Sequence, residues 1–177
     1  MFSPLLYHVL ANYIVWIACV LSAARGEDYL GLNVALLLSA MQFGYHIYYH
    51  RAQCIVGLAC ILCILILGIV SDSLLLYTHV LWFNANPFTV ISPLWMWGIW
   101  LNFAVTIFCG LQAWFRRYVV LLPCCFLGFA IAYYSGAALG AAVLLKGYIS
   151  LWLVAITYTL WLPIILYVFS RYIDAEG

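Results

Sequence analysis

Six long apolar runs dominate the sequence, and each has about the length of a membrane-spanning helix. They cover residues 4–24, 29–49, 53–77, 91–114, 119–139 and 148–170. A helix needs about 20 apolar residues to cross the hydrocarbon core of a bilayer. None of the runs has the strict alternation of a membrane β-strand. The pattern predicts an all-α, polytopic integral membrane protein, a bundle of six transmembrane helices that forms one domain over residues 1–177.

Composition excludes the main soluble classes of protein. Hydrophobic residues make up 69% of the chain and charged residues only 6%, whereas a soluble domain carries about 25% charged residues. The formal net charge is +1, without a basic block that could bind phosphates. We therefore expect no nucleic-acid partner. The expected partner is the lipid bilayer, with another membrane protein as an open alternative.

The charges between the runs predict the orientation of the bundle. With six spans, Arg51, Arg116, Arg117 and Arg171 fall on the side of the N-terminus, and the opposite side carries the basic residues Arg25 and Lys146. Basic residues favour the cytoplasmic side of a membrane. The first 24 residues contain no Lys or Arg, unlike a signal peptide, so we interpret the first run as a span. Both termini are expected in the cytoplasm.

Asp72 lies within the third run, where a carboxylate is energetically expensive. A charged side chain at the centre of a membrane helix costs about 3 kcal/mol in insertion measurements, and such residues are often functional. Ser73 follows directly, and His79 lies two helical turns further along the same predicted face. Two interpretations stay open. Asp72 is either a structural carboxylate, hydrogen-bonded by a nearby serine or by the fourth span, or a group that binds a ligand or handles a proton.

The fourth run combines tryptophans with an amide and a hydroxyl. Trp95, Trp97 and Trp100 lie within six positions, and Asn102 and Thr106 share a helix face. Amphipathic rings can wall a pocket, and an amide in a bilayer needs a partner, which usually lies on another helix. This run predicts either interfacial anchoring with helix packing, or a Trp-lined ligand cavity that opens to the outer leaflet.

The fifth run has small residues at every fourth position. These are Gly128, Ala132, Gly136 and Gly140. Such a ridge lets two helix backbones approach closely, and we expect it to pack against another helix of the same chain rather than to mediate dimerisation. Tyr133 and Tyr134 flank the ridge and are candidates to present hydroxyl groups to a ligand in the interior.

A metal or haem site is the weakest of the predicted sites. His46, His50 and Cys54 are spaced by four and would share one face if the second helix ran that far. Two histidines and a cysteine suit zinc, and the alternative is interfacial histidines without metal. No zincin, nucleotide-binding or nucleophile-elbow motif occurs. We therefore assign no catalytic residue and no cofactor, and a non-enzymatic role is favoured.

Three segments together resemble a known family. They run from Gly68 to Leu75, from Pro93 to Ala104 and from Ala132 to Ala141. In order and spacing they resemble small bacterial inner-membrane proteins grouped as domain of unknown function 2878. The resemblance implies six helices in the inner membrane of a Gram-negative bacterium and supplies no activity. That family tends to carry a basic residue where this chain has Ala138. If that residue pairs with the carboxylate of the third span in relatives, Asp72 must find another partner here.

Three functions remain as hypotheses. The first is binding or translocation of a small molecule or lipid without an ATPase of its own, based on Asp72 and the tryptophans. The second is a structural or assembly partner of a membrane enzyme, based on the small-residue ridge. The third is a haem- or metal-binding membrane redox protein, based on His46, His50 and Cys54.

Overall fold

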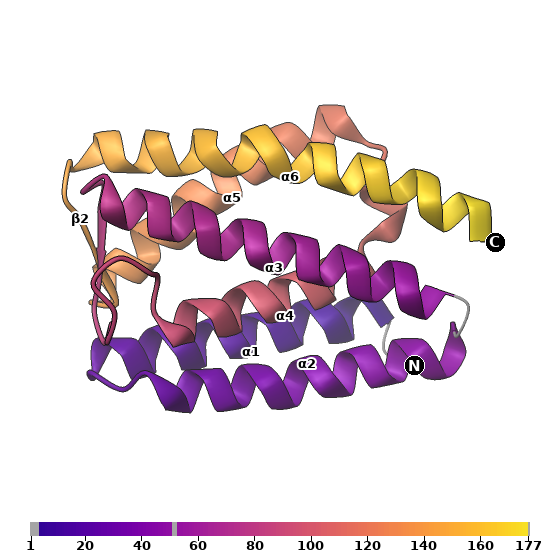
Figure 1. The fold of residues 1–177 in the computed structure, drawn as a ribbon, viewed down its shortest axis with the longest axis horizontal. Coiled ribbons are helices and arrows are strands. Elements are labelled where there is room, and N and C mark those ends of the chain that lie inside the picture. The colour runs from indigo at the N-terminus through magenta and orange to yellow at the C-terminus, as the bar shows by residue number, and fades with distance from the viewer. Residues whose placement is uncertain (1–3, 51–52, 177) are drawn as a thin grey trace.

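The computed structural model describes residues 4–50 and 53–176, and six helices make up most of this part of the chain. Successive helices run in opposite directions along one long axis, so both chain termini lie at the same end of the bundle (Figure 1). We call this the terminal end, and the opposite end the sheet end. The helices are α1 (Pro4–Ala24), α2 (Tyr29–Tyr49), α3 (Cys54–Tyr77), α4 (Leu94–Gly110), α5 (Tyr118–Ala138) and α6 (Tyr148–Glu176).

The prediction of an all-helical bundle is confirmed, but the fourth helix is shorter than expected. Five helices are long and apolar enough to cross a membrane, whereas α4 has 17 residues, or about 25 Å. Pro93, with extended backbone (ψ 159°), precedes its first turn. The helix ends at Gly110, and a separate 3-10 turn follows at Gln112–Trp114. The predicted span 91–114 is therefore too long at both ends.

Two short strands at the sheet end were not predicted. Strand β1 (Leu81–Phe83) pairs antiparallel with β2 (Ala142–Leu144), and this pairing joins the α3–α4 connection to the α5–α6 connection. α5 stops at Ala138, close to the predicted limit of residue 139. α6 runs on to Glu176, beyond the predicted limit of residue 170.

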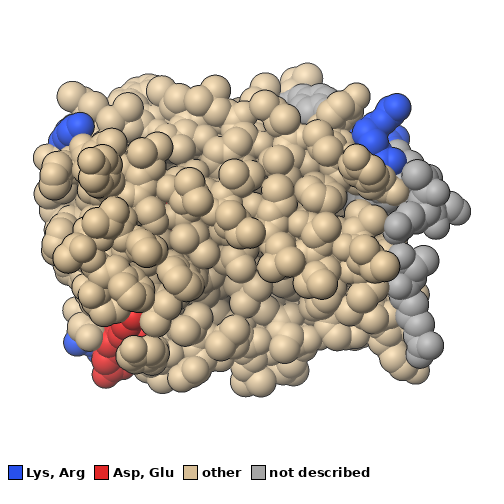
Figure 2. All heavy atoms as spheres, viewed as in Figure 1, with Lys and Arg blue, Asp and Glu red and all other residues tan. Residues whose placement is uncertain are grey.

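Charged residues lie at the two ends of the bundle. Figure 2 shows basic side chains at both ends, acidic side chains at the sheet end, and no charged side chain across the middle of the visible face. This distribution suits a protein whose central band contacts hydrocarbon. Both termini lie at the end that carries Arg116, Arg117 and Arg171. The cytoplasmic placement of that end stays a prediction.

Helix α4 occupies the centre, and it packs against α1, α2 and α3. Close approach depends on glycines of these helices. A Cβ atom on Gly31 would lie 2.5 Å from the Cα of Cys19, and one on Gly98 would lie 2.9 Å from the Cβ of Ala35. α5 packs mainly against α6 and β2. The helices therefore pack more closely around α1, α2 and α4 than around α5.

Candidate ligand-binding site

Asp72 is fully buried, with 0% of its surface exposed, and side chains from three other helices surround it. Trp100 Nε1 of α4 donates a hydrogen bond to Oδ2 (2.6 Å). Tyr133 of α5 and Tyr158 of α6 donate to Oδ1, the latter at 2.5 Å. The two tyrosine hydroxyls also lie 2.9 Å apart. Since an ionised carboxylate only accepts hydrogen bonds, these donors satisfy Asp72 without a cation.

The local sequence explains how Trp100 reaches the carboxylate. Gly68 lies one helical turn before Asp72 on α3, and any Cβ there would collide with the Trp100 ring. The Trp100 ring also stacks on the ring of Phe129 of α5, with ring centroids 5.7 Å apart. It contacts the rings of Tyr158 and Trp161 of α6 as well. The Asp72 cluster (Asp72, Trp100, Tyr133 and Tyr158) therefore links α3, α4, α5 and α6.

A cavity of about 750 Å³ lies beside this cluster, between α1 and α4 on one side and α5 and α6 on the other. This volume is within the range of small-molecule pockets, about 300–1,000 Å³. Trp100 and Tyr133 form part of its wall, whereas Asp72 and Tyr158 lie behind the wall. Most of the lining is aliphatic or aromatic; the polar side chains that reach it include Asn12 of α1.

The small residues of α5 face this cavity, and the prediction that the ridge packs against another helix of the chain is wrong for Gly128 and Gly136. Gly128, Ala132 and Gly136 all line the cavity. A Cβ atom on Gly128 or Gly136 would have no heavy atom within 4 Å. Gly140 lies beyond the end of α5, in a turn with φ +85°. The cavity stays open along Gly128, Ala132 and Gly136 because these residues have small side chains that do not fill it.

The cavity opens sideways between α1 and α5. Among its lining residues, Tyr13 and Ile17 of α1 and Ile131 of α5 are exposed on the surface of the bundle. All three are large apolar or amphipathic side chains of helices long enough to span a membrane. In a bilayer this opening would face lipid rather than water.

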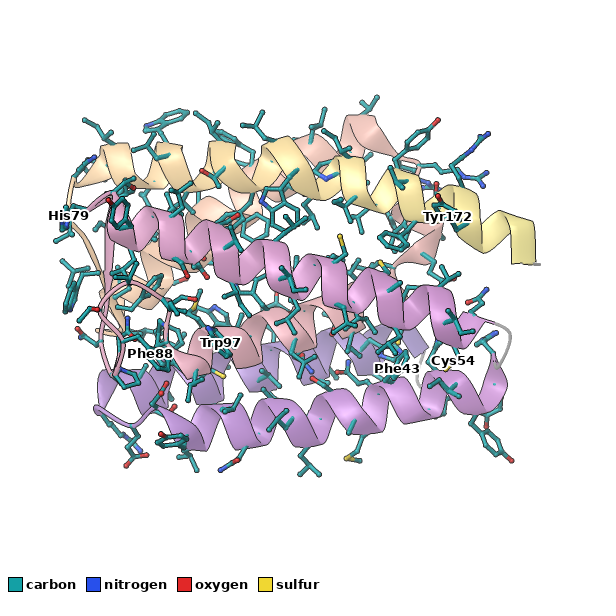
Figure 3. All side chains as sticks on the ribbon, in the orientation of Figure 1. Phe43, Cys54, His79, Phe88, Trp97 and Tyr172 are labelled. Carbon is teal, nitrogen blue, oxygen red and sulfur yellow. The ribbon has the colours of Figure 1, made fainter. Side chains whose placement is uncertain are left out.

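Several predicted site residues lie elsewhere. Ser73 Oγ donates to Ile69 O and accepts from Ser92 N, so it ties the α3–α4 connection to α3. α3 ends at Tyr77, and His79 lies in the following turn with φ 53°, at the sheet end of the molecule (Figure 3). The expectation that His79 shares a helix face with Asp72 is therefore wrong.

The two adjacent tyrosines of α5 have opposite environments. Tyr133 is buried in the Asp72 cluster, while Tyr134 is 54% exposed. Residues next to each other on a helix point about 100° apart, and here only Tyr133 reaches the interior. Tyr134 is outside the candidate site.

The fourth helix divides its polar residues between two faces. Trp95 is buried at the edge of the cavity, and its Nε1 donates to Asn84 O (3.0 Å). Asn102 points away from Asp72 and donates to Ser39 Oγ (3.0 Å) and Gln42 Oε1 (2.7 Å) of α2. Asn102 therefore joins helices and does not bind a ligand in the cavity.

Asn102 belongs to a buried polar network that the sequence did not reveal as a unit. Gln42 Nε2 lies 3.2 Å from His8 Nδ1, from His8 O and from Thr106 Oγ1. Asn12 Nδ2 donates to Asn102 Oδ1 (3.3 Å). We call His8, Asn12, Gln42, Asn102 and Thr106 the amide network. It connects α1, α2 and α4 through neutral groups and the ring of His8.

The predicted metal site is not assembled as expected. α2 ends at Tyr49, His50 caps it, and Cys54 begins the next helix. The rings of His46 and His50 are in contact, with centroids 4.9 Å apart. Within the described residues, no group of three or more His, Cys, Asp or Glu side chains could hold a metal ion. All seven cysteines are free thiols.

A second buried carboxylate, which was not predicted as a site residue, lies at the sheet end. Asp28 precedes α2 and is only 8% exposed. Its Oδ1 accepts from Trp95 N (3.0 Å) and so caps α4, while Oδ2 is buried without a partner among the described residues. Burial raises the pKa of Asp28, and the hydrogen bonds from the α4 backbone offset this only in part.

These features define a class: a small helical bundle with apolar spans, a carboxylate held by neutral donors, and a lateral apolar cavity. The chain belongs to the family described as "Protein of unknown function (DUF2878)", whose model matches residues 5–164. The resemblance seen in the sequence is thereby confirmed. No curated protein and no solved structure matches the chain.

Proposed function

We propose that this chain is an integral protein of the bacterial inner membrane that binds a small amphipathic molecule or a lipid in the lateral cavity. Five helices with the length and apolar character of membrane spans support the membrane location. The confinement of charge to the two ends of the visible face supports it as well. The sequence has no nucleotide-binding motif, so the proposal includes no nucleotide hydrolysis by this chain.

The observation that carries this proposal is the 750 Å³ cavity with its opening between α1 and α5. Protein interiors are normally packed as densely as organic crystals, and an unfilled apolar cavity reduces stability. A Cβ atom at Gly128 or Gly136 would have nothing within 4 Å, so a larger side chain there would extend into the space. Small residues therefore leave room for a molecule that supplies the missing contacts.

The test compares two glycine-to-leucine variants. Gly136 lines the cavity, and Gly44 lies on the exposed face of α2; a Cβ atom added at either position would have no heavy atom within 4 Å. The protein is extracted in a mild detergent, and the molecules that remain bound are measured by mass spectrometry. We expect the wild type and Gly44→Leu to retain the same lipid-like molecule and Gly136→Leu to lose it. Equal retention in all three proteins would contradict the proposal.

An assembly role is the second candidate, and the exposed position of Gly128 favours it. Gly128 lies at the edge of the cavity on the surface of α5, where a small residue allows a helix of another protein to approach closely. If this function holds, Gly136→Leu keeps its bound lipid, and Gly128→Leu loses a co-purifying membrane protein. The two functions thus predict different losses from neighbouring positions.

A further inference from the structure

The cavity is elongated along the bundle axis. Phe83, Trp95 and Ala142 line it at the sheet end, and Leu111 and Trp114 line it at the terminal end. The segment from Trp95 of α4 to the C-cap residue Leu111 alone extends about 24 Å. This is most of the thickness of a bilayer core, about 30 Å. The shape suits an extended hydrocarbon chain aligned with the spans better than a compact molecule.

The two ends of the cavity differ in charge. At the terminal end, the guanidinium carbon of Arg117 lies 4.9 Å from the ring centre of Trp114, which lines the cavity. Arg117 also precedes the first turn of α5, where the helix dipole is positive. Arg117 therefore places a cation against the cavity wall at this end.

At the sheet end of the cavity, two carboxylates lie against the wall. Asp28 binds the backbone nitrogen of Trp95, and Asp72 lies directly behind Trp100 and Tyr133. Trp95, Trp100 and Tyr133 all belong to the cavity wall. An anionic group would be repelled there and attracted at Arg117, and the apolar lining between the two ends offers no other cation.

We infer that the cavity binds a lipid with one long hydrocarbon chain and an anionic phosphate head group, and that the head group binds Arg117 at the terminal end. This inference rests on the proposed function and adds the chemical class and orientation of the ligand. The guanidinium fork matches phosphate geometry and forms charge-assisted hydrogen bonds with it. The chain extends from Trp114 towards Trp95, past the small residues of α5.

The experiment uses the full-length protein in neutral detergent and two probes with the same chain, hexadecyl phosphate and hexadecyltrimethylammonium. Binding is followed by native mass spectrometry and by tryptophan fluorescence. We expect the wild type to bind the phosphate probe at least tenfold more tightly. Arg117→Gln should weaken this binding about tenfold, since a charge-assisted hydrogen bond is lost. Arg171→Gln, an exposed arginine at the same end, should leave it unchanged, and inorganic phosphate should not compete.

The outcomes separate this inference from the proposed function. If both probes bind the wild type equally and Gly136→Leu prevents both from binding, the cavity binds amphiphiles but the anionic head group is wrong. If inorganic phosphate competes, the site recognises free phosphate and the lipid is wrong. If neither probe binds and Gly136→Leu changes nothing, the proposed function itself fails. The comparison of head groups on the wild type holds even if Arg117→Gln does not fold.

Discussion

The two faces of α4 differ in how completely they are packed. On the face towards α1 and α2, Gly98 lets the helix backbones approach, and Asn102 of the amide network bonds to α2. On the face towards α5, Met96, Ile99 and Phe103 border the open cavity. The same 17-residue helix thus contributes to a closed interface and to an open one.

This difference shows what closes a helix interface in an apolar solvent. Lipid chains are as apolar as leucine, so helices in a bilayer associate through close packing and hydrogen bonds rather than through the hydrophobic effect. The closed face has both: glycine contacts and the amide network. Among the described side chains, the hydrogen bonds across the open face belong to the Asp72 cluster, towards its sheet end. Small residues on α5 are therefore not sufficient to close it.

The largest expected effect tests the closed face. Gly98→Leu places a side chain where a Cβ atom already lies 2.9 Å from Ala35 and 3.3 Å from the Cα of Leu32. Because backbone must move, we expect a loss of about 3 kcal/mol or more in the free energy of unfolding. Gly136→Leu, on the open side, should leave the free energy of unfolding almost unchanged. Thermal unfolding in detergent, followed by circular dichroism, measures both. Equal losses would contradict the division into closed and open faces.

A smaller effect tests the Asp72 cluster, with two matched variants. Tyr133→Phe and Tyr158→Phe each remove one hydrogen-bond donor from the same oxygen of Asp72. We expect each to reduce the free energy of unfolding by about 1–2 kcal/mol, as for a lost hydrogen bond to a charged group. The double variant should lose more than the sum, because Asp72 then keeps only Trp100 as a donor.

The variants Tyr133→Phe and Tyr158→Phe also distinguish an effect on stability from an effect on ligand binding. Tyr133 lines the cavity and Tyr158 does not. We therefore expect only Tyr133→Phe to change the affinity for hexadecyl phosphate, although the two variants unfold at similar temperatures. If Tyr158→Phe changes the affinity as much, the cluster acts on the ligand through the helix positions rather than through the cavity wall.

The sequence predicts the helices better than the contacts between them. Long apolar runs separated by charges predicted five of the six helices to within a few residues, except for the C-terminal end of α6. α4 begins after Pro93 and ends at Gly110. Both residues lie inside an apolar run, so no charge marks the ends of the helix in the sequence. The strands at 81–83 and 142–144 depend on pairing between distant connections, which no local pattern indicates.

The candidate site could be predicted only in part, for a related reason. A carboxylate in an apolar run singles out Asp72, and Trp100 and Tyr133 were predicted as site residues, although not as its partners. Tyr158 was missed, because nothing distinguishes it from the other tyrosines until the rotation of α6 is known. Gly128 and Gly136 were recognised as a small-residue ridge, but such a ridge looks the same whether a helix or an empty space faces it.

The smallest expected effect concerns Asp28, the carboxylate with one unpartnered oxygen. Burial raises its pKa, so the folded state binds a proton more tightly than the unfolded state does. The free energy of unfolding should therefore be higher below the ordinary aspartate pKa, about 3.9, and fall as the pH rises through the raised value. This direction is opposite to that of a carboxylate stabilised by a salt bridge.

Two substitutions at this position separate the charge of Asp28 from its role as a cap. Asp28→Asn keeps an oxygen for the backbone nitrogen of Trp95 and cannot ionise. Its free energy of unfolding should therefore lack the fall expected of the wild type as the pH rises above the ordinary aspartate pKa. Asp28→Ala loses the pH dependence and also the cap, which is worth about 1 kcal/mol. Chemical unfolding at a series of pH values measures both. If Asp28→Asn keeps the wild-type slope, another group titrates, and the sheet-end carboxylate behaves like Asp72, as a fully satisfied acceptor.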